Sequence, residues 1–427
     1  MSEPRKHVVI VGGGFGGLWA TRALASAPVR ITLIDRRNHH LFQPLLYQVA
    51  TAGLSSPDIA APLRHILRKQ ANVEVRLGEV TGIDAAARSV SLADGDAIGY
   101  DFLLLASGAT HAYFGHDEWS AHAPGLKTLD DALHIRRRVL LAFERAEAAQ
   151  TEQEREAWLH FAVVGGGPTG VEMAGTLAEI ARKTLRREFR RIDPAKARVR
   201  LIEAGPRVLA SFPESLSEKA RAQLQRLGVE VSTGTPVGAI DASGYTLGAQ
   251  FVPARTVLWA AGVAASPLGA LLDAPRDRAG RVQVLPDLSV PGHPEIFVAG
   301  DLASLQQADG KPVPGVAPAA KQMGSHVAQS IRARVSGKAA PAPFRYVDFG
   351  NLATIGRRAA VVDLRGLHFS GVLAWSFWLA AHVFFLIGFR NRLLVLLNWS
   401  WAYYTYQRHA RIILGGVGDA PADADDD

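Results

Sequence analysis

His7-Val-Val-Ile-Val-Gly-Gly-Gly-Phe-Gly-Gly17 is the first of two similar glycine-rich stretches, and the second is His160-Phe-Ala-Val-Val-Gly-Gly-Gly-Pro-Thr-Gly170. Each combines a short apolar run, a G-x-G-x-x-G turn and a small-residue segment typical of a helix, Leu18–Ala25 and Val171–Ala181. The glycines allow a tight turn and close backbone approach, and the helix start offers free N–H groups and a positive dipole end. The repeat therefore predicts two pyrophosphate-binding turns.

A second apolar strand that ends in an acid follows each turn. These strands are Arg30-Ile-Thr-Leu-Ile-Asp35 and Val199-Arg-Leu-Ile-Glu203. A carboxylate at that position accepts hydrogen bonds from a ribose diol and repels a 2′-phosphate. One glycine motif is weak evidence in a chain with 41 glycines among 427 residues. Strand, turn, helix and acid together, found twice, predict two dinucleotide sites.

The composition excludes several classes of protein. With no cysteine, the chain has no disulfide framework, no thiolate metal site and no redox-active C-x-x-C, so the dithiol reductases are excluded and no metal site is expected. The net charge is +7, but no basic cluster is interleaved with stacking aromatics. An anionic membrane surface or nucleotide substrates therefore explain the charge better than nucleic acid.

The motifs predict an α/β fold with two Rossmann-like dinucleotide-binding domains, one inserted into the other, plus a C-terminal helical membrane-anchoring segment. The strands at Tyr100–Ala109 and Thr256–Gly262 mark the edges of the insertion, and residues 132–156 and 182–198 are expected to form charged surface helices. Because Met1–Lys6 leads directly into the first strand, no signal peptide is expected and the body should face the cytoplasm. The predicted domains are 1–112 with 265–342, 113–264, 343–415, and a disordered acidic tail at 416–427.

The C-terminal region is unusually apolar. No formally charged residue occurs from Gly366 to Phe389, and aromatic residues are dense there and in Trp399–Tyr406. Three interpretations are open: a membrane span, a helical pair lying in the membrane surface, and a core helix. Flanking arginines and aromatic residues at both ends favour the membrane surface.

With these features together, the chain resembles the type II NADH:quinone oxidoreductases over about residues 5–415. Besides the glycine motifs, His40-Leu-Phe-Gln-Pro-Leu-Leu-Tyr-Gln-Val-Ala50 is similar to the family's segment beside the flavin ring. Phe297-Val-Ala-Gly-Asp301 resembles its flavin-binding strand, and Gly388-Phe-Arg-Asn-Arg392 resembles part of its membrane anchor. The resemblance implies FAD as cofactor in the first site, NADH in the second, and a quinone tunnel that opens at the membrane.

The resemblance also implies roles for individual residues. Asp35 is expected to bind the adenosine ribose of FAD and Asp301 the ribityl chain, although Asp301 has an alternative role as a helix N-cap. Glu203 is expected to hold the ribose of NADH, with the nearby Arg207 leaving room for NADPH. The predicted FAD-binding residues are Gly12, Gly14, Phe15, Gly16, Gly17, Asp35, Gln43, Ser107, Gly108 and Asp301, and the predicted NADH-binding residues are Gly165, Gly167, Pro168, Gly170, Glu203 and Gly262.

Two residues are predicted to be catalytic, Glu172 and Gln322. Glu172 aligns with Trp19 of the first repeat, so an acid occupies a position that is apolar in the sister motif. It is expected to relay protons to quinone, and the alternative is stabilisation of the helix dipole. The family often has A-Q-x-A-x-Q near the quinone; here Ala317-Pro-Ala-Ala-Lys-Gln322 retains only the second Gln. Weaker candidates for the quinone side are Lys321, Arg357, Arg358 and His382.

The expected function is oxidation of NADH through FAD with reduction of a membrane quinone, without proton pumping. The partners are NADH, quinone and the cytoplasmic surface of the inner membrane, and a homodimer is plausible. Two alternatives are open. One is an NAD(P)H flavoprotein reductase with a non-quinone acceptor, and the other is an NADH-sensing flavoprotein like apoptosis-inducing factor in architecture.

Overall fold

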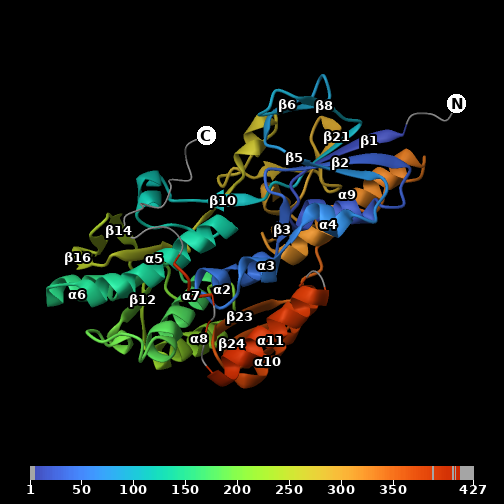
Figure 1. Ribbon diagram of the computed structural model, residues 1–427. Coiled ribbons are helices and arrows are strands. Elements are labelled where there is room, and N and C mark those ends of the chain that lie inside the picture. Colours follow the sequence, from blue (N-terminus) through green and yellow to red (C-terminus); the bar gives the residue numbers. More distant parts are fainter. Residues whose placement is uncertain (1–4, 387–388, 406–407, 409, 414–427) are drawn as a thin grey trace. The chain divides into compact units, whose positions relative to one another are not determined.

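The computed structural model describes residues 5–386, 389–405, 408 and 410–413. The chain divides into two compact units (Figure 1). Unit 1 holds the residues up to Leu41, Ala60–Thr110 and Val263–Phe349, and unit 2 holds Phe42–Ile59, His111–Gly262 and the chain from Gly350 onward. The predicted acidic tail at 416–427 lies outside the described residues.

Unit 1 is built on a six-stranded sheet in the order β20-β21-β9-β1-β2-β5. The first glycine motif follows β1, which pairs in parallel with both neighbours and is buried from His7 to Val11, as expected for a central parallel strand. The strands are β1 (Lys6–Val11), β2 (Val29–Asp35), β5 (Val73–Leu77), β9 (Phe102–Leu105), β20 (Ser289–Val290) and β21 (His293–Val298); the helices are α1 (Phe15–Ala23), α4 (Leu63–Leu67) and α9 (Ala317–Val335).

Unit 2 repeats this plan with a four-stranded parallel sheet in the order β13-β12-β11-β17. The second glycine motif follows β11, every residue of which is buried. The strands are β11 (His160–Val164), β12 (Arg198–Glu203), β13 (Val229–Thr233) and β17 (Thr256–Trp259); the helices are α2 (Leu46–Ala50), α3 (Ser56–Ile59), α5 (Leu129–Ala148), α6 (Glu152–Trp158), α7 (Pro168–Glu179) and α8 (Glu214–Arg226). The predicted α/β class with two Rossmann-like halves is confirmed.

The C-terminal region of unit 2 begins with an antiparallel sheet that was not predicted. Its strands are β23 (Asn351–Gly356), β24 (Ala359–Leu364) and β25 (Leu367–Ser370), and β23 packs on α7. Helices α10 (Val372–Phe385) and α11 (Phe389–Thr405) follow, and α10 packs on β24. The C-terminal region is therefore an α/β element of unit 2 and not a purely helical one.

Short antiparallel strands complete both units. Three-stranded sheets form from β6-β7-β8 in unit 1 and from β14-β15-β16 in unit 2, and β3-β4, β10-β18 and β19-β22 form two-stranded pairs. Their bounds are β3 (His39–Leu41), β4 (Ala60–Pro62), β6 (Val80–Asp84), β7 (Ser89–Leu92), β8 (Ala97–Gly99), β10 (Ala109–His111), β14 (Val237–Ile240), β15 (Gly244–Leu247), β16 (Gln250–Pro253), β18 (Val263–Ala265), β19 (Val282–Gln283) and β22 (Ala303–Ser304).

Both predicted surface helices need correction. The segment 132–156 is divided between α5, which ends at Ala148, and α6, which begins at Glu152. Thr151 caps the start of α6 by accepting a hydrogen bond from the Glu154 N–H. The basic helix predicted at 182–198 does not form: after a π-helical turn at Ile180–Thr184 the chain is mostly irregular. There the Glu147 carboxylate accepts hydrogen bonds from three consecutive backbone N–H groups, of residues 190, 191 and 192, which are then not available to a helix.

A glycine sets the distance between α1 and α9. A Cβ added at Gly324 would lie 2.1 Å from the carbonyl oxygen of Gly16, far inside van der Waals contact. We expect Gly324→Ala to lower the free energy of unfolding by about 1–3 kcal/mol, because the two helices must separate. Thermal unfolding of the purified variant measures this loss. Gly99→Ala is the control, since the nearest atom is 3.8 Å away, and equal midpoints for the two variants would contradict the prediction.

Candidate functional site

The two glycine turns have the same geometry. Gly12 and Gly165 adopt φ values of +104° and +109°, and their N–H groups donate to the carbonyls of Ile34 and Ile202 at 2.8 Å in each case. A Cβ at the last glycine of either motif would lie 1.8 Å from the carbonyl oxygen of the first. Only glycine permits this backbone and this packing of the helix on the turn.

The acids at the ends of β2 and β12 hold the glycine turns. Asp35 accepts a hydrogen bond from the Gly13 N–H at 2.5 Å, and Glu203 accepts one from the Gly166 N–H at 2.6 Å. The second oxygen of each acid accepts from a backbone N–H two residues later, at 2.7 Å in both cases. Each carboxylate is thus fixed beside the turn, where a ribose diol would hydrogen-bond to it.

The middle glycine of each motif faces open space. A Cβ at Gly14 or Gly167 would meet no atom of the described chain within 4 Å. These residues are the N-caps of α1 and α7, and neither helix has a side-chain cap in the part of the chain that the structure describes. Both helix starts therefore leave backbone donors and room for an anion, which fits the pyrophosphate of a dinucleotide.

The other residues predicted for the first site are divided between the units. Unit 1 holds Phe15, Ser107, Gly108 and Asp301, whereas Gln43 belongs to unit 2, where its amide donates to the Lys127 carbonyl at 3.5 Å. The buried Ser107 hydroxyl has no hydrogen-bond partner among the described residues, which suits a ligand contact. Gly108 (φ +73°) accepts from the Ser266 N–H at 3.1 Å, and Asp301 lies in the 3₁₀ turn Gly300–Leu302.

The second site lies wholly in unit 2. Pro168 is the first residue of α7, where its missing N–H costs nothing. Gly262 has φ +78°, and a Cβ there would lie 2.5 Å from the Ala112 carbonyl oxygen. Arg207 donates to the carbonyls of Phe212 and Ala210 at 3.0 and 3.1 Å, so its guanidinium is bound to backbone in this structure.

Glu172 is buried in the second turn of α7, with 8% of its surface exposed. Its Oε1 accepts a long hydrogen bond from the Thr354 N–H of β23, at 3.4 Å. Burial raises the pKa of the Glu172 carboxyl well above its usual range. Glu172 is therefore a buried carboxyl whose protonated form is favoured, and it is not a surface acid at the helix start.

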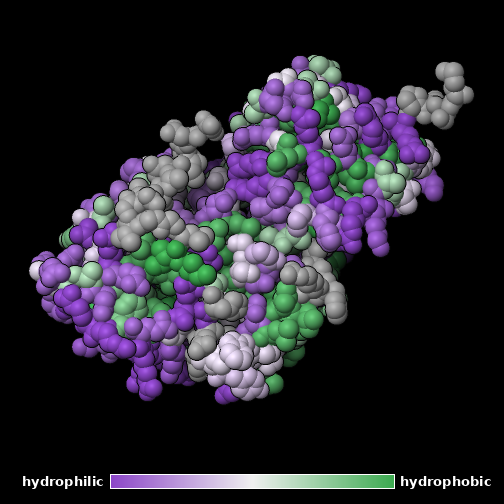
Figure 2. Space-filling view, viewed as in Figure 1, coloured by the Kyte–Doolittle hydropathy of each residue, from purple (hydrophilic) through white to green (hydrophobic). Residues whose placement is uncertain are grey.

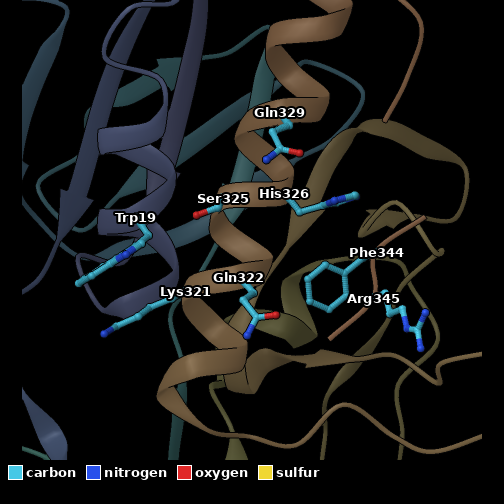
Figure 3. Close-up of a pocket in the computed structure, with 8 residues that line it drawn as sticks. All are labelled: Trp19, Lys321, Gln322, Ser325, His326, Gln329, Phe344 and Arg345. Atoms are coloured by element: carbon cyan, nitrogen blue, oxygen red, sulfur yellow. The ribbon is translucent and has the colours of Figure 1, made fainter. Parts of the chain in front are cut away.

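Gln322 and Lys321 of α9 line a cavity of about 410 Å³ (Figure 3). The Gln322 amide makes two hydrogen bonds to the backbone of Val347, at 2.9 and 3.0 Å, and so fixes the segment after α9. The Lys321 ammonium lies 4.4 Å from the Trp19 ring centre, and burial lowers its pKa to about 8. The cavity is lined by Trp19, Lys321, Gln322, Ser325, His326, Gln329, Phe344 and Arg345.

Of the four weaker candidates for the quinone side, Lys321 lies in unit 1 and the other three lie in unit 2. Arg357 donates its backbone N–H to Glu179 at 2.5 Å, and Arg358 has φ +59° in the turn between β23 and β24. His382 of α10 stacks on Trp378, with ring centres 4.2 Å apart, and hydrogen-bonds to the Trp378 carbonyl. Burial lowers the pKa of His382 to about 4, so its imidazole is neutral. These three residues belong to unit 2, and Gln322 belongs to unit 1.

Sequence reasoning missed a polar cluster beside Glu172. Tyr47 and Gln48 belong to the segment that supplied Gln43, but their role depends on Trp399, far away in the sequence, which hydrogen-bonds to Gln48. Arg408 forms a half-buried ion pair with Glu179 at 3.3 Å. Adjacent polar residues inside an otherwise apolar run were the signal for Tyr47 and Gln48, whereas no local signal marks Trp399 or Arg408.

Two family models and several curated proteins match this chain. The family model described as pyridine nucleotide-disulphide oxidoreductase matches residues 6–324, and the one described as NDH2 C-terminal domain matches residues 349–405. The chain is 48% identical over 421 residues to the type II NADH:quinone oxidoreductase Ndh of Mycobacterium tuberculosis, covering 95% of this chain and 90% of the relative. A second relative from that organism, NdhA, is 47% identical over 93% of this chain and 87% of its own length.

Solved structures agree on the fold. NDH2 from Plasmodium falciparum in complex with NADH has a TM-score of 0.87 at 20% identity, covering 96% of this chain and all of that one. The sulfide:quinone oxidoreductase of Aquifex aeolicus has a TM-score of 0.71 at 21% identity, covering 91% and 92%. The chain belongs to the type II NADH:quinone oxidoreductases, as the resemblance predicted. It is an enzyme of that family, and the class implies a flavin cofactor.

The open glycines allow a test of the two sites. Alanine at Gly14 or Gly167 touches no atom of the described chain, so folding should be unaffected, but its methyl occupies the space for a pyrophosphate. We expect Gly14→Ala to lose flavin during purification. Gly167→Ala should keep its flavin and bind a nicotinamide nucleotide about tenfold more weakly. Flavin absorbance and nucleotide titration measure the two effects, and the opposite pattern would interchange the sites.

Proposed function

We propose that this enzyme binds FAD at the first glycine turn and NADH at the second, and transfers electrons from NADH to a membrane quinone. The two complete nucleotide cradles on one chain carry this proposal. A bound flavin would supply the redox chemistry, since NADH gives a hydride and the chain has no cysteine. The described residues hold the nucleotides and provide protons.

The donor preference follows from Glu203. Its carboxylate, fixed at the end of β12, accepts hydrogen bonds from a ribose diol and repels the 2′-phosphate of NADPH. Arg207 is the nearby cation that would favour NADPH, but its guanidinium is bound to two backbone carbonyls. We infer that NADH is the preferred donor.

The proton for quinone is assigned to Glu172. Quinone takes up two electrons and two protons, whereas a hydride brings two electrons and one proton, so one proton per turnover comes from elsewhere. Glu172 is buried on α7, the helix of the second nucleotide site, and burial raises its pKa well above the usual range, which favours the protonated form. It is the described carboxyl group best suited to deliver that proton.

We expect Glu172→Gln to slow quinone reduction by about 10²-fold, because the amide cannot supply the proton. In the wild type, this rate should fall as the pH rises through the raised pKa of Glu172, since the protonated form is the donor; the variant should lack this decline. Anaerobic flavin absorbance measures both half-reactions: bleaching by NADH should be unchanged, and recovery on adding a short-chain quinone should be slow. Full-speed recovery in the variant would remove the proton role.

The acceptor side is assigned to the C-terminal helices. Apolar side chains gather over α10 and α11 (Figure 2), and Leu373, Phe384 and Tyr404 are 75%, 68% and 81% exposed. No helix within the described ranges is long and apolar enough to cross a membrane. We infer that α10 and α11 lie in the cytoplasmic surface of the inner membrane, where quinone is dissolved.

A pair of substitutions tests the membrane contact. We expect Leu373→Glu with Phe384→Glu to shift the enzyme from lipid vesicles to the supernatant in a sedimentation assay, because two carboxylates replace exposed apolar groups. Flavin reduction by NADH should be unchanged. Phe251→Glu is the control, since Phe251 is also exposed (46%) but lies on β16. Equal release of the control, or no release of the pair, would place the membrane contact elsewhere.

A further inference from the structure

A chain of hydrogen bonds connects α11 to the segment beside Glu172. The Trp399 indole Nε1–H donates to the Gln48 Oε1 at 2.7 Å, and the Gln48 Nε2–H donates to the Tyr47 hydroxyl at 3.0 Å. All three residues belong to unit 2. The chain therefore runs from an apolar C-terminal helix to a tyrosine hydroxyl in the interior of the unit.

The direction of this chain is fixed by chemistry. An indole N–H is only a donor, so the amide oxygen of Gln48 must face Trp399 and the amide NH₂ must face Tyr47. The Tyr47 oxygen thus accepts from Gln48, which leaves its own hydroxyl proton available to donate to another acceptor. Trp399 consequently determines, through Gln48, which way the tyrosine donates.

The surroundings of Tyr47 keep it protonated. Only 4% of the residue is exposed, and its backbone carbonyl accepts from the Thr51 hydroxyl at 2.7 Å. Burial raises the pKa of the Tyr47 hydroxyl well above its usual range, and Glu172 raises it further whenever its carboxyl is ionised. The other charged groups that act on it are Glu179 of α7 and Arg408, which follows α11. Helix α2, which carries Tyr47, packs on α7, which carries Glu172.

We propose that Tyr47 is a second proton-transfer residue of the quinone half-reaction, with Gln48 and Trp399 as its positioning residues. This inference rests on the proposed quinone reduction. Tyr47 lies between the helix of the second nucleotide site and the apolar helices through which a membrane-dissolved quinone would arrive.

The proton step balances without a further reactant. The Tyr47 O–H bond breaks as its proton moves to a quinone oxygen, and the same tyrosine oxygen takes the proton of the Glu172 carboxyl. Glu172 then regains a proton from water. One proton enters per turnover, and the hydride of NADH provides the two electrons and the other proton. The tyrosine ends each turnover in the state in which it began.

The experiment compares half-reactions of the purified, flavin-loaded enzyme in detergent. Flavin reduction by NADH should be the same in all variants. Reoxidation by a short-chain quinone should slow by about 10²-fold in Tyr47→Phe and by about tenfold in Gln48→Met and in Trp399→Phe. In Tyr47→Phe the reoxidation rate should also lose the alkaline decline of the wild type, because the proton of Glu172 no longer reaches quinone.

Two comparisons separate positioning from packing. Trp401→Phe also removes an indole from α11, but Trp401 is 59% exposed, so this variant should reoxidise at the wild-type rate. Trp399→Phe should cause no further loss once Gln48 is Met, because the path from the indole to Tyr47 is already broken. Equal slowing by Trp399→Phe and Trp401→Phe, or multiplied losses in the double variant, would overturn the positioning role.

Different results would overturn quinone reduction and the role of Tyr47. A wild-type flavin that NADH bleaches but quinone does not restore would overturn quinone reduction itself. A wild type that quinone restores, together with Tyr47→Phe at full speed and with an unchanged pH profile, would overturn only the role of Tyr47.

Discussion

Close backbone contact at glycine is the constraint on which both units depend. In each unit the helix of the nucleotide site starts directly on its turn, where an added Cβ would lie 1.8 Å from a carbonyl oxygen. Each of these helices also meets a second element through glycine: Gly324 places α9 against α1, and Gly175 places β23 against α7, with an added Cβ only 1.6 Å from the Ile355 carbonyl oxygen. The positions of α9 and of the C-terminal sheet therefore follow from the same requirement that forms the turns.

The local parts of this arrangement could be predicted from the sequence. The glycine turns, their strands and the acids Asp35 and Glu203 lie within short stretches, and the conformation of each is decided by neighbouring residues. The 182–198 segment shows the limit of local reasoning. Its Arg-rich composition favours a helix, but the Glu147 carboxylate, distant in sequence, binds three of its backbone N–H groups. Tertiary contacts overrode propensity there.

In the candidate site, too, the local features could be predicted from the sequence and the long-range contacts could not. The residues that would hold nucleotides were predicted from spacing, whereas the surroundings of Glu172 were not. Its hydrogen-bond donor Thr354 and the neighbouring Tyr47 come from distant parts of the chain, as does Trp399, which bonds to Gln48. Glu172 and Glu179 lie seven positions apart on α7, close to two full turns, and so share a face of the helix. Glu179 is paired with Arg408, whereas Glu172 accepts a hydrogen bond from a backbone N–H. The sequence alone does not distinguish an ion-paired acid from one that burial keeps protonated.

The C-terminal segment is bonded to the rest of unit 2 at several points, although its apolar composition is typical of an added anchor. Residues 42–59 lie between two strands of unit 1 in the sequence but belong to unit 2. Asn391, Asn398 and Trp399 hydrogen-bond to this segment, at Pro57, Asp58 and Gln48. Arg408 donates to the Thr51 carbonyl at 3.1 Å as well as to Glu179. Removing the C-terminal segment would leave Glu179 as a partly buried charge without this partner and Gln48 without its donor. The region that we propose contacts the membrane is therefore also the region that completes the surroundings of Glu172 and Tyr47, the proposed proton-transfer residues.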